Sequence, residues 1–157
     1  DKLEGGNLSQ TKERFDVVKE LEQVMLGFDS PRLQLTPSQE VVWVSADRQL
    51  VSVVLKNLIE NALKYSPKDS RVQLSVQRLP WREGEGVCVQ VSNLPGDAGW
   101  PDAQRLFSKY YRSAGSHRST GSGLGLHLSK QMALYLGGDV RYVPFDDCVR
   151  FEFWLPV

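Results

Sequence analysis

Residues 50–67 read LVSVVLKNLIENALKYSP, and their apolar positions recur at intervals of three and four residues. This spacing predicts a long amphipathic helix, because such positions fall on one side of a 3.6-residue turn. Asp47 can serve as its N-cap or first-turn acid, and Ser66 and Pro67 predict its end near Tyr65. The apolar side that we expect to pack on the core consists of Val51, Leu55, Leu58, Ile59 and Ala62.

The same helix carries polar side chains on a second side. Asn57, Asn61 and Lys64 stand at positions i, i+4 and i+7, within a narrow arc. An amide oxygen is a hard ligand that can join the coordination shell of a Mg²⁺ already carried by phosphates, and a lysine one turn further along can meet those phosphates. Spacing alone leaves two interpretations, a metal-nucleotide face and an ordinary solvated face.

Strand and helix patterns fill the rest of the chain. Residues 71–79 and 87–93 alternate apolar and polar positions and predict an antiparallel hairpin with WREGEG as its loop. Strands and helices in mixed order are typical of the α+β class, here a mixed, mostly antiparallel sheet covered by helices on one face. The other expected elements are a short strand and a helix within 12–28, strands at 32–36 and 41–45, a helix at 124–136 ended by Gly137 and Gly138, and strands at 139–144 and 149–155.

Length and composition limit the class of protein. A chain of 157 residues, 41% hydrophobic and 24% charged, has the size and composition of one globular domain. Basic and acidic residues number 19 each, so no overall field draws the chain to nucleic acid or an acidic membrane, and an anionic ligand must be held locally. Cys88 and Cys148 suit neither a disulfide framework nor a zinc site and are expected to be small core residues. No apolar run approaches the roughly 20 residues that span a bilayer, so we expect a soluble chain or the soluble piece of a longer one.

A glycine run precedes the helix expected at 124–136. The sequence from residue 121 reads GSGLGLHLSK, with Gly121, Gly123 and Gly125 at alternate positions. Alternate glycines let the backbone approach a ligand closely, and a helix N-terminus offers free N–H groups to phosphate. The run has neither the lysine of a P-loop nor the spacing of the dinucleotide fingerprint. By itself it fits a phosphate site or a flexible hinge with a helix cap.

Three segments occur in an order that is more specific than any one of them: NLIENALKYSP at 57–67, LFSKYYR at 106–112 and GSGLGL at 121–126. They resemble the N box, F box and second glycine box of the catalytic, ATP-binding domain of bacterial sensor histidine kinases, in the superfamily that includes DNA gyrase and the mismatch-repair ATPases. The resemblance implies a Bergerat fold, a two-layer α/β sandwich with a long ATP lid, over residues 12–157. Residues 1–11 resemble the linker from a dimerisation and phosphoacceptor domain absent from this chain.

The N-box resemblance implies roles for four residues of the long helix. Asn61 corresponds to the asparagine that ligates Mg²⁺, Asn57 to the supporting asparagine one turn earlier, and Lys64 to the basic residue that reaches the ATP phosphates. Tyr65 matches an aromatic residue that flanks the nucleotide. ATP-hydrolysing members of the superfamily tend to hold a glutamate at the position of Asn57 as general base for water, so this site is suited to holding ATP for a separate nucleophile.

The other two boxes imply a mobile lid over the phosphates. Phe107 corresponds to the phenylalanine that anchors this lid, and Arg112 is a candidate cation for closing on phosphate. The residues that match the second glycine box, whose glycines line the phosphate channel and whose leucines pack beneath it, are Gly121, Gly123, Leu124, Gly125 and Leu126.

The first glycine box of the family is altered in this chain. The family pattern is Asp-x-Gly-x-Gly after the second hairpin strand, whereas this sequence has Asn93, Leu94, Pro95, Gly96 and Asp97. The resemblance implies that position 93 accepts a hydrogen bond from the adenine amino group. A neutral amide still accepts, but a charge-assisted bond is roughly twice as strong, so a several-fold loss of affinity is expected. Proline at position 95 stiffens the base of the loop.

The activity implied is that of a histidine protein kinase that binds ATP and Mg²⁺ and donates the γ-phosphate to a histidine on a dimerisation domain, which passes it to a response regulator in two-component signal transduction. His117 and His127 lack a neighbouring carboxylate to orient an imidazole, so neither is expected to be that nucleophile. The fragment is expected to be monomeric, to leave itself unphosphorylated, and to contact neither nucleic acid nor membrane directly.

The family also implies a cytoplasmic domain of a protein anchored in the bacterial inner membrane. Two alternatives remain open. One is a degenerate module that no longer binds ATP and serves a signalling kinase as a docking or regulatory domain. The other is a serine kinase of the anti-sigma type, which fits the F box less well.

Overall fold

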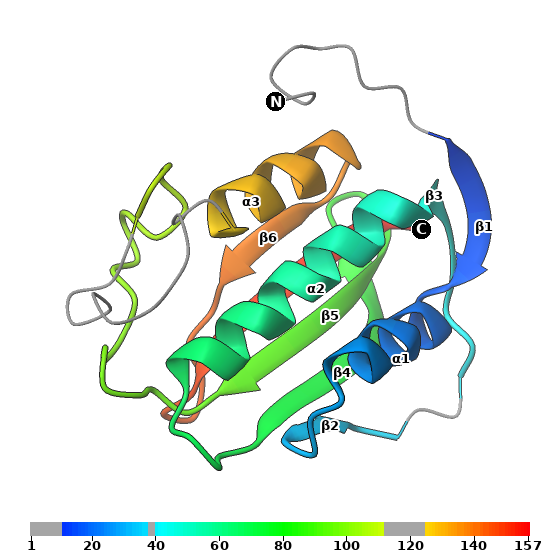
Figure 1. Cartoon of the computed structure of the whole chain (residues 1–157). Helices are drawn as coiled ribbons and strands as arrows, with labels where there is room; N and C mark the ends of the chain where they lie inside the picture. The colour runs from blue at the N-terminus through cyan, green and yellow to red at the C-terminus, as the bar shows by residue number, and fades with distance from the viewer. Residues whose placement is uncertain (1–10, 38–39, 112–124) are drawn as a thin grey trace.

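The computed structural model describes residues 11–37, 40–111 and 125–157. Every strand and helix expected from the sequence pattern is present there, with ends that differ by a few residues (Figure 1). The elements in chain order are β1 (Lys12–Asp16), α1 (Val17–Phe28), β2 (Leu33–Leu35), β3 (Trp43–Asp47), α2 (Arg48–Tyr65), β4 (Val72–Trp81), β5 (Gly84–Asn93), α3 (Gly125–Tyr135), β6 (Asp139–Tyr142) and β7 (Val149–Pro156).

Five strands form the main sheet in the order β2-β4-β5-β7-β6, and β1 pairs with β3 in a separate two-stranded sheet. Among the described strands, β2 and β4 pair in parallel, and the other neighbours in both sheets pair antiparallel. The three helices of the described residues lie on one face of the main sheet, with α2 crossing its middle between α1 and α3 (Figure 1). The predicted α+β class, with helices on one face of a mostly antiparallel sheet, is confirmed.

Helix α2 begins where the sequence predicts, because Asp47 is its N-cap. One carboxylate oxygen of Asp47 accepts hydrogen bonds from the backbone N–H groups of Gln49 and Leu50, at 3.1 and 3.2 Å. The apolar side of α2 packs into the main core. Its buried residues are Val51, Val54, Leu55, Leu58, Ile59 and Ala62. The packing of this side leaves the opposite side of the helix available for other contacts.

The β4–β5 hairpin is longer than its sequence pattern indicates. Pairing continues to Trp81 and Gly84, which leaves Arg82 and Glu83 as a two-residue turn. The predicted WREGEG loop is therefore wrong in extent. Trp81 stacks on Trp154 of β7 with ring centroids 5.7 Å apart, and this packing holds β4 in an extended conformation to its end.

The two cysteines have different environments. Cys88 lies in a small cluster with Trp81 and Trp154, and burial, aided by the charge of Glu152, raises the pKa of its thiol to about 12. This residue is the small core cysteine that the sequence predicts. Cys148 is also free, but it is half-buried in the turn before β7, so the prediction of a core position is wrong for it.

The end of α3 requires two glycines for two different reasons. Gly137 has a φ of 83°, the left-handed conformation that commonly ends a helix. Gly138 passes so close to the backbone of Trp154 that a Cβ there would collide with the Trp154 carbonyl oxygen. The predicted helix stop is confirmed, and it also lets β6 follow directly beside β7. None of the described helices is long and apolar enough to cross a membrane.

Candidate functional site

Asn57 and Asn61 lie at the margin between the core and the surface of α2. Both amides are half-buried, whereas Lys56 and Glu60 of the same helix are exposed. The fully solvated side of α2 is therefore taken by Lys56 and Glu60. The asparagines sit where a side chain can contact a ligand and the protein at once, which favours the ligand-face interpretation over the solvated one.

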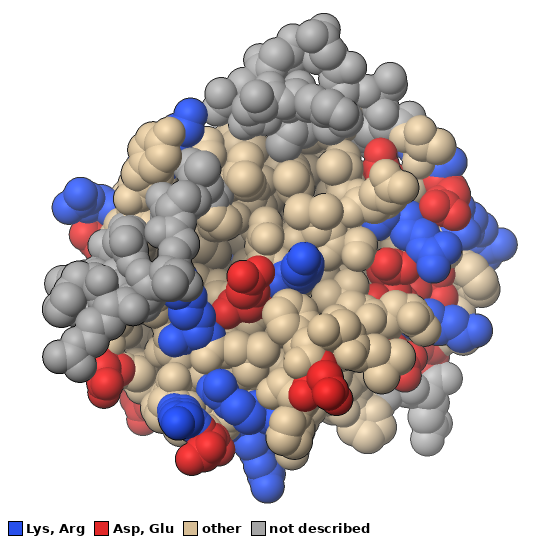
Figure 2. All heavy atoms as spheres, in the orientation of Figure 1, with Lys and Arg blue, Asp and Glu red and all other residues tan. Residues whose placement is uncertain are grey.

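Lys64 extends this row of polar side chains to the last turn of α2. Its side chain is exposed, and its Nζ lies 5.5 Å from the centroid of the Tyr65 ring. On the face in Figure 2, the described basic and acidic side chains are interspersed over the helices and do not gather by sign. A local cation such as Lys64 must therefore supply the attraction for an anionic ligand.

Asn93 is the last residue of β5, and its side chain is buried, with 3% of the residue exposed. Its Nδ2 donates a hydrogen bond to the Leu94 carbonyl oxygen at 2.8 Å, which fixes the orientation of the amide. Its Oδ1 is buried and receives no hydrogen bond from the described residues. A buried acceptor without a donor costs about 1–3 kcal/mol. The side chain is thus arranged to accept an N–H group from a ligand, as the amino group of adenine would supply.

The turn after Asn93 packs directly against the end of α2. A Cβ at Gly96 would collide with the Tyr65 carbonyl oxygen and would lie 3.2 Å from the Ser66 carbonyl carbon. The Gly99 N–H donates to the Gly96 carbonyl oxygen at 2.9 Å and closes the turn, with Gly99 at a φ of 74°. The altered glycine box therefore keeps one glycine that only this close approach explains. The sequence pattern did not identify that role for Gly96.

Phe107 attaches the loop after β5 to the sheet and to α3. Its ring meets Phe151 of β7 edge to face at 6.1 Å, and the neighbouring Leu106 is buried in the main core. The Phe107 carbonyl oxygen lies 3.3 Å from Nδ1 of His127, and Nζ of Lys130 lies 4.9 Å from the ring centroid. These contacts place Phe107 as a fixed point at the base of the loop.

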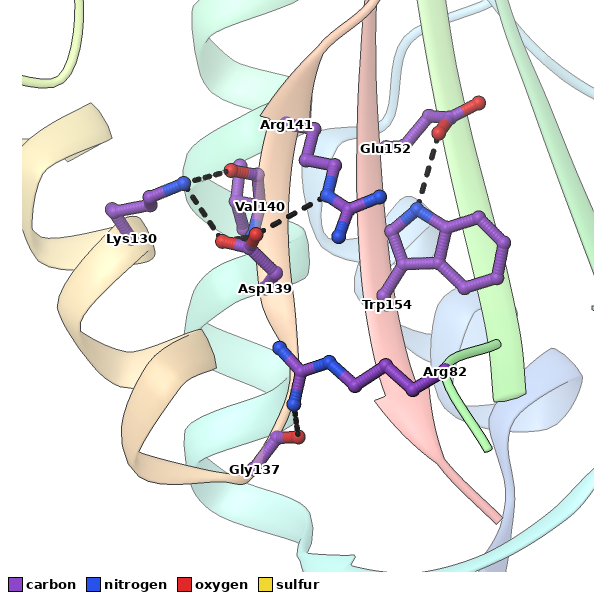
Figure 3. A network of polar contacts seen from close by, with 8 residues as sticks. All are labelled: Arg82, Lys130, Gly137, Asp139, Val140, Arg141, Glu152 and Trp154. Atoms are coloured by element: carbon purple, nitrogen blue, oxygen red, sulfur yellow. Dashed lines mark hydrogen bonds and ion pairs between the residues drawn. The ribbon is translucent and has the colours of Figure 1, made fainter. Parts of the chain in front are cut away.

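Lys130 joins this fixed point to β6, a link that the sequence analysis missed. Its Nζ donates to Asp139 Oδ1 at 2.7 Å and to the Val140 carbonyl oxygen at 2.9 Å, and Arg141 Nε donates to the other Asp139 oxygen at 3.2 Å (Figure 3). Burial would raise the pKa of Asp139, but the hydrogen bonds from Lys130 and Arg141 outweigh it and lower that pKa below its ordinary value. Asp139 is therefore held ionised at neutral pH.

The second glycine box falls largely outside the described residues. Arg112, Gly121, Gly123 and Leu124 belong to the undescribed segment, as does His117. Gly125 begins α3 and is exposed, and a Cβ there would meet no atom within 4 Å. Leu126 is half-buried against the main core.

The described residues hold no group of three or more His, Cys, Asp and Glu side chains that could bind a metal ion. The donor set near Asn61 is neutral amide and ammonium. Such a set suits an ion that arrives with anionic phosphate ligands of its own, as Mg²⁺ does with a nucleotide.

Comparison with known proteins identifies the family of this fold. A family model described as histidine kinase-, DNA gyrase B- and HSP90-like ATPase matches residues 46–157. Swarming motility regulation sensor protein RssA of Serratia marcescens is 34% identical over 109 residues, 69% of this chain and 22% of RssA. Sensor histidine kinase WalK of Bacillus subtilis is 31% identical over 121 residues, 69% of this chain and 20% of WalK. The chain spans about a fifth of the length of these relatives.

Solved structures share the architecture over nearly the whole chain. The catalytic domain of the histidine kinase ThkA has a TM-score of 0.78 at 20% identity, covering 94% of this chain and 96% of that one. Acinetobacter baumannii histidine kinase AdeS has a TM-score of 0.73 at 21% identity, covering 98% and 71%. The predicted fold of histidine kinase catalytic domains is confirmed.

Proposed function

Because the chain belongs to the histidine kinase-, DNA gyrase B- and HSP90-like ATPase family, and its relatives are sensor histidine kinases, we propose that it binds ATP with Mg²⁺ and donates the γ-phosphate to a histidine on a separate dimerisation domain. The observation that carries the proposal is the buried Oδ1 of Asn93, which no described residue satisfies. The amino group of adenine is a donor of the kind that this atom lacks.

The base end of the proposed site consists of Asn93 and the last turn of α2. One N–H of Asn93 Nδ2 is used by the Leu94 carbonyl oxygen, whereas the buried Oδ1 receives no hydrogen bond from the described residues, so Oδ1 is the atom that contacts the base in this proposal. A 6-amino purine offers it a hydrogen, whereas a 6-oxo purine brings a second oxygen. Tyr65, half-buried beside this turn, flanks the nucleotide in the proposal.

The phosphate end consists of the polar side of α2. Mg²⁺, when bound, neutralises phosphate charge and orients the γ-phosphate for transfer. Asn61 would hold the ion through its amide oxygen, with Asn57 supporting it from one turn earlier. Lys64 reaches a phosphate by leaving the Tyr65 ring, an exposed cation–π contact worth about 0.5–1 kcal/mol.

The loop anchored by Phe107 would cover the phosphates as a lid. Gly121, Gly123 and Gly125 would line the phosphate channel above Leu124 and Leu126, and Arg112 would approach the phosphates on closure. These roles are supported by the family match, which includes residues 106–126. Asn57 carries no basic group, so the site retains ATP and leaves the attack to the incoming histidine.

The partners follow from this activity. The γ-phosphate acceptor is a dimerisation and phosphoacceptor domain, reached through residues 1–11 as linker, and a response regulator then receives the phosphate from that domain. The isolated chain is a monomer that leaves itself unphosphorylated. The full protein is anchored in the bacterial inner membrane with this domain in the cytoplasm.

Titration of the chain with a fluorescent ATP analogue, with Mg²⁺ and with EDTA, tests the proposal. A saturable signal that needs Mg²⁺ supports it, and acid-labile phosphate on histidine after fusion to the native dimerisation domain would complete it. The substituted first glycine box favours a second candidate, a regulatory module without ATP binding. A chain that shows no saturable binding under either condition would contradict the proposal and favour that candidate.

A further inference from the structure

We propose that Arg32 is a positioning residue for the nucleotide site and acts through the last turn of α2. This inference rests on the proposed function. Arg32 precedes β2 and belongs to none of the motifs. Its guanidinium donates to four acceptors around the end of α2. They are the Leu63 carbonyl oxygen at 3.2 Å from Nη1, the Ser66 hydroxyl and the Pro67 carbonyl oxygen (3.1 Å) from Nη2, and the Ser70 carbonyl oxygen at 2.7 Å from Nε.

Helix α2 needs this outside donor because its C-terminus lacks a local cap. The last four carbonyl groups of a helix have no partner within it. In α1, the left-handed Asp29 returns its N–H to the Leu26 carbonyl oxygen at 3.2 Å. The corresponding residue of α2, Ser66, is extended, with φ −93° and ψ 162°, and closes no such turn. Arg32 supplies a donor to the Leu63 carbonyl oxygen, one of these last four, and binds three acceptors in the segment that follows the helix.

The turn that Arg32 holds is connected to both ends of the proposed site. Lys64 and Tyr65 lie between two of the acceptors, Leu63 and Ser66, along the chain. The backbone of Tyr65 and Ser66 in turn contacts Gly96, with no space even for a Cβ. A displacement of this turn would therefore move the phosphate-binding lysine and the loop that follows Asn93 together.

The charge of Arg32 acts in the same direction. A helix C-terminus carries roughly half a negative charge, which repels an approaching polyphosphate. The hydrogen bonds from Arg32 to the Leu63 carbonyl oxygen and the Ser66 hydroxyl place the guanidinium at this end of the helix. Arg32 offsets the negative end while leaving Lys64 to meet the phosphates.

The test compares Arg32→Gln and Arg32→Lys in the whole chain, each assayed well below its melting temperature. We expect Arg32→Gln to weaken binding of a fluorescent ATP analogue with Mg²⁺ by about tenfold or more, equivalent to the loss of a charge-assisted hydrogen-bond network. Arg32→Lys keeps the charge but not the planar fork, so we expect it to recover only a small part of this loss. Arg71→Gln, at an exposed arginine directly after the acceptor Ser70, should change the affinity less than about twofold.

A second control and a measurement without ligand distinguish a positioning role of Arg32 from a purely structural one. Arg48→Gln breaks the ion pair of Arg48 with Glu20 at the other end of α2, and should lower the melting temperature without the affinity loss. Amide hydrogen exchange should quicken in Arg32→Gln at residues 63–66 and 93–96 but not in the first half of α2.

Three results would overturn the inference. A parent chain that binds nucleotide while Arg32→Gln binds it equally well overturns this inference alone. Equal affinity losses in Arg32→Gln and Arg48→Gln would reduce Arg32 to general stability. A parent chain that binds no nucleotide overturns the proposed function, and the positioning role with it.

Discussion

The phosphate end and the base end of the proposed site are assembled differently. Asn57, Asn61 and Lys64 stand on one continuous helix, so the helical repeat sets their spacing. The base end joins the last residue of β5 and the turn that follows it at Gly96 to the last turn of α2, two segments that only packing brings together. The spacing of the phosphate end therefore follows from the helix itself, whereas the base end depends on a close contact between distant segments.

The largest effect is expected from Gly96→Ala, which disrupts the contact between the turn at Gly96 and the last turn of α2. The added methyl group must displace the backbone of Tyr65 or of the turn, and such overpacking costs about 2 kcal/mol. For a domain of this size that lowers the melting temperature by about 4–8 °C in a thermal denaturation experiment followed by circular dichroism. Gly84→Ala is the matched control, because a Cβ at that position meets no atom within 4 Å. Equal melting temperatures for the two variants would contradict the close contact.

Asn61→Ala tests the phosphate end of the proposed site. Removing the amide should weaken Mg²⁺-dependent binding of the ATP analogue by about 30-fold, or about 2 kcal/mol, and leave the weak binding in EDTA almost unchanged. The melting temperature should stay close to that of the parent, because Asn61 is only half-buried. Lys56→Ala, an exposed residue of the same helix, serves as control. A loss of equal size with and without Mg²⁺ would remove Asn61 from the metal site.

Asn93→Ala tests base recognition with a smaller effect. The loss of one neutral hydrogen bond should weaken ATP binding several-fold, about 1 kcal/mol. Competition titrations with ATP and ITP give the sharper measurement, because Oδ1 accepts from a 6-amino group and opposes a 6-oxo group. We expect the parent to prefer ATP and the variant to bind both nearly alike. A preference that survives in Asn93→Ala, at the level seen in a Ser92→Ala control, would show that another group reads the base.

The smallest effect is expected at the Lys130–Asp139 ion pair, which contacts Phe107 through Lys130 and belongs to neither the phosphate end nor the base end of the site. The folded pKa of Asp139 is depressed below the ordinary 3.8, so its contribution to stability is present above that pH and is lost as the pH falls through the folded pKa. Asp139→Asn should be less stable than the parent by under about 1 kcal/mol at pH 7, in urea denaturation, with a smaller difference near pH 3. The exposed Glu83→Gln serves as control. A difference that grows on acidification would contradict the sign of the shift.

The sequence predicted the helices, and with them the phosphate end of the site, better than the base end. The cap at Asp47, the buried row of α2 and the stop at Gly137 follow from local hydrogen bonding and periodicity, and all are present. The extent of the β4–β5 hairpin was misjudged, because the stacking of Trp81 on Trp154 involves strands far apart in the chain. The half-buried position of Cys148 was missed for a similar reason, since an apolar neighbourhood in sequence does not report which residues a turn exposes.

The links between elements could not be predicted at all. Lys130 reaches β6, and Arg32 reaches acceptors 31 to 38 residues away. No periodicity encodes such distances, because the pattern along a helix or strand reports only which side is apolar. A lysine or arginine in an amphipathic segment leaves the same sequence pattern whether its side chain is solvated or hydrogen-bonds to another helix or strand.

Order of motifs and local pattern were thus enough for the fold class, the family resemblance and the placing of Asn57, Asn61 and Lys64 on one helix. Packing alone left the Asn93 oxygen buried without a donor, pressed Gly96 against Tyr65 and brought Arg32 to the end of α2. The physical reason is the distance along the chain over which each interaction acts. Helical spacing and capping act over a few residues, whereas burial and the satisfaction of helix ends depend on which distant segments the core brings together.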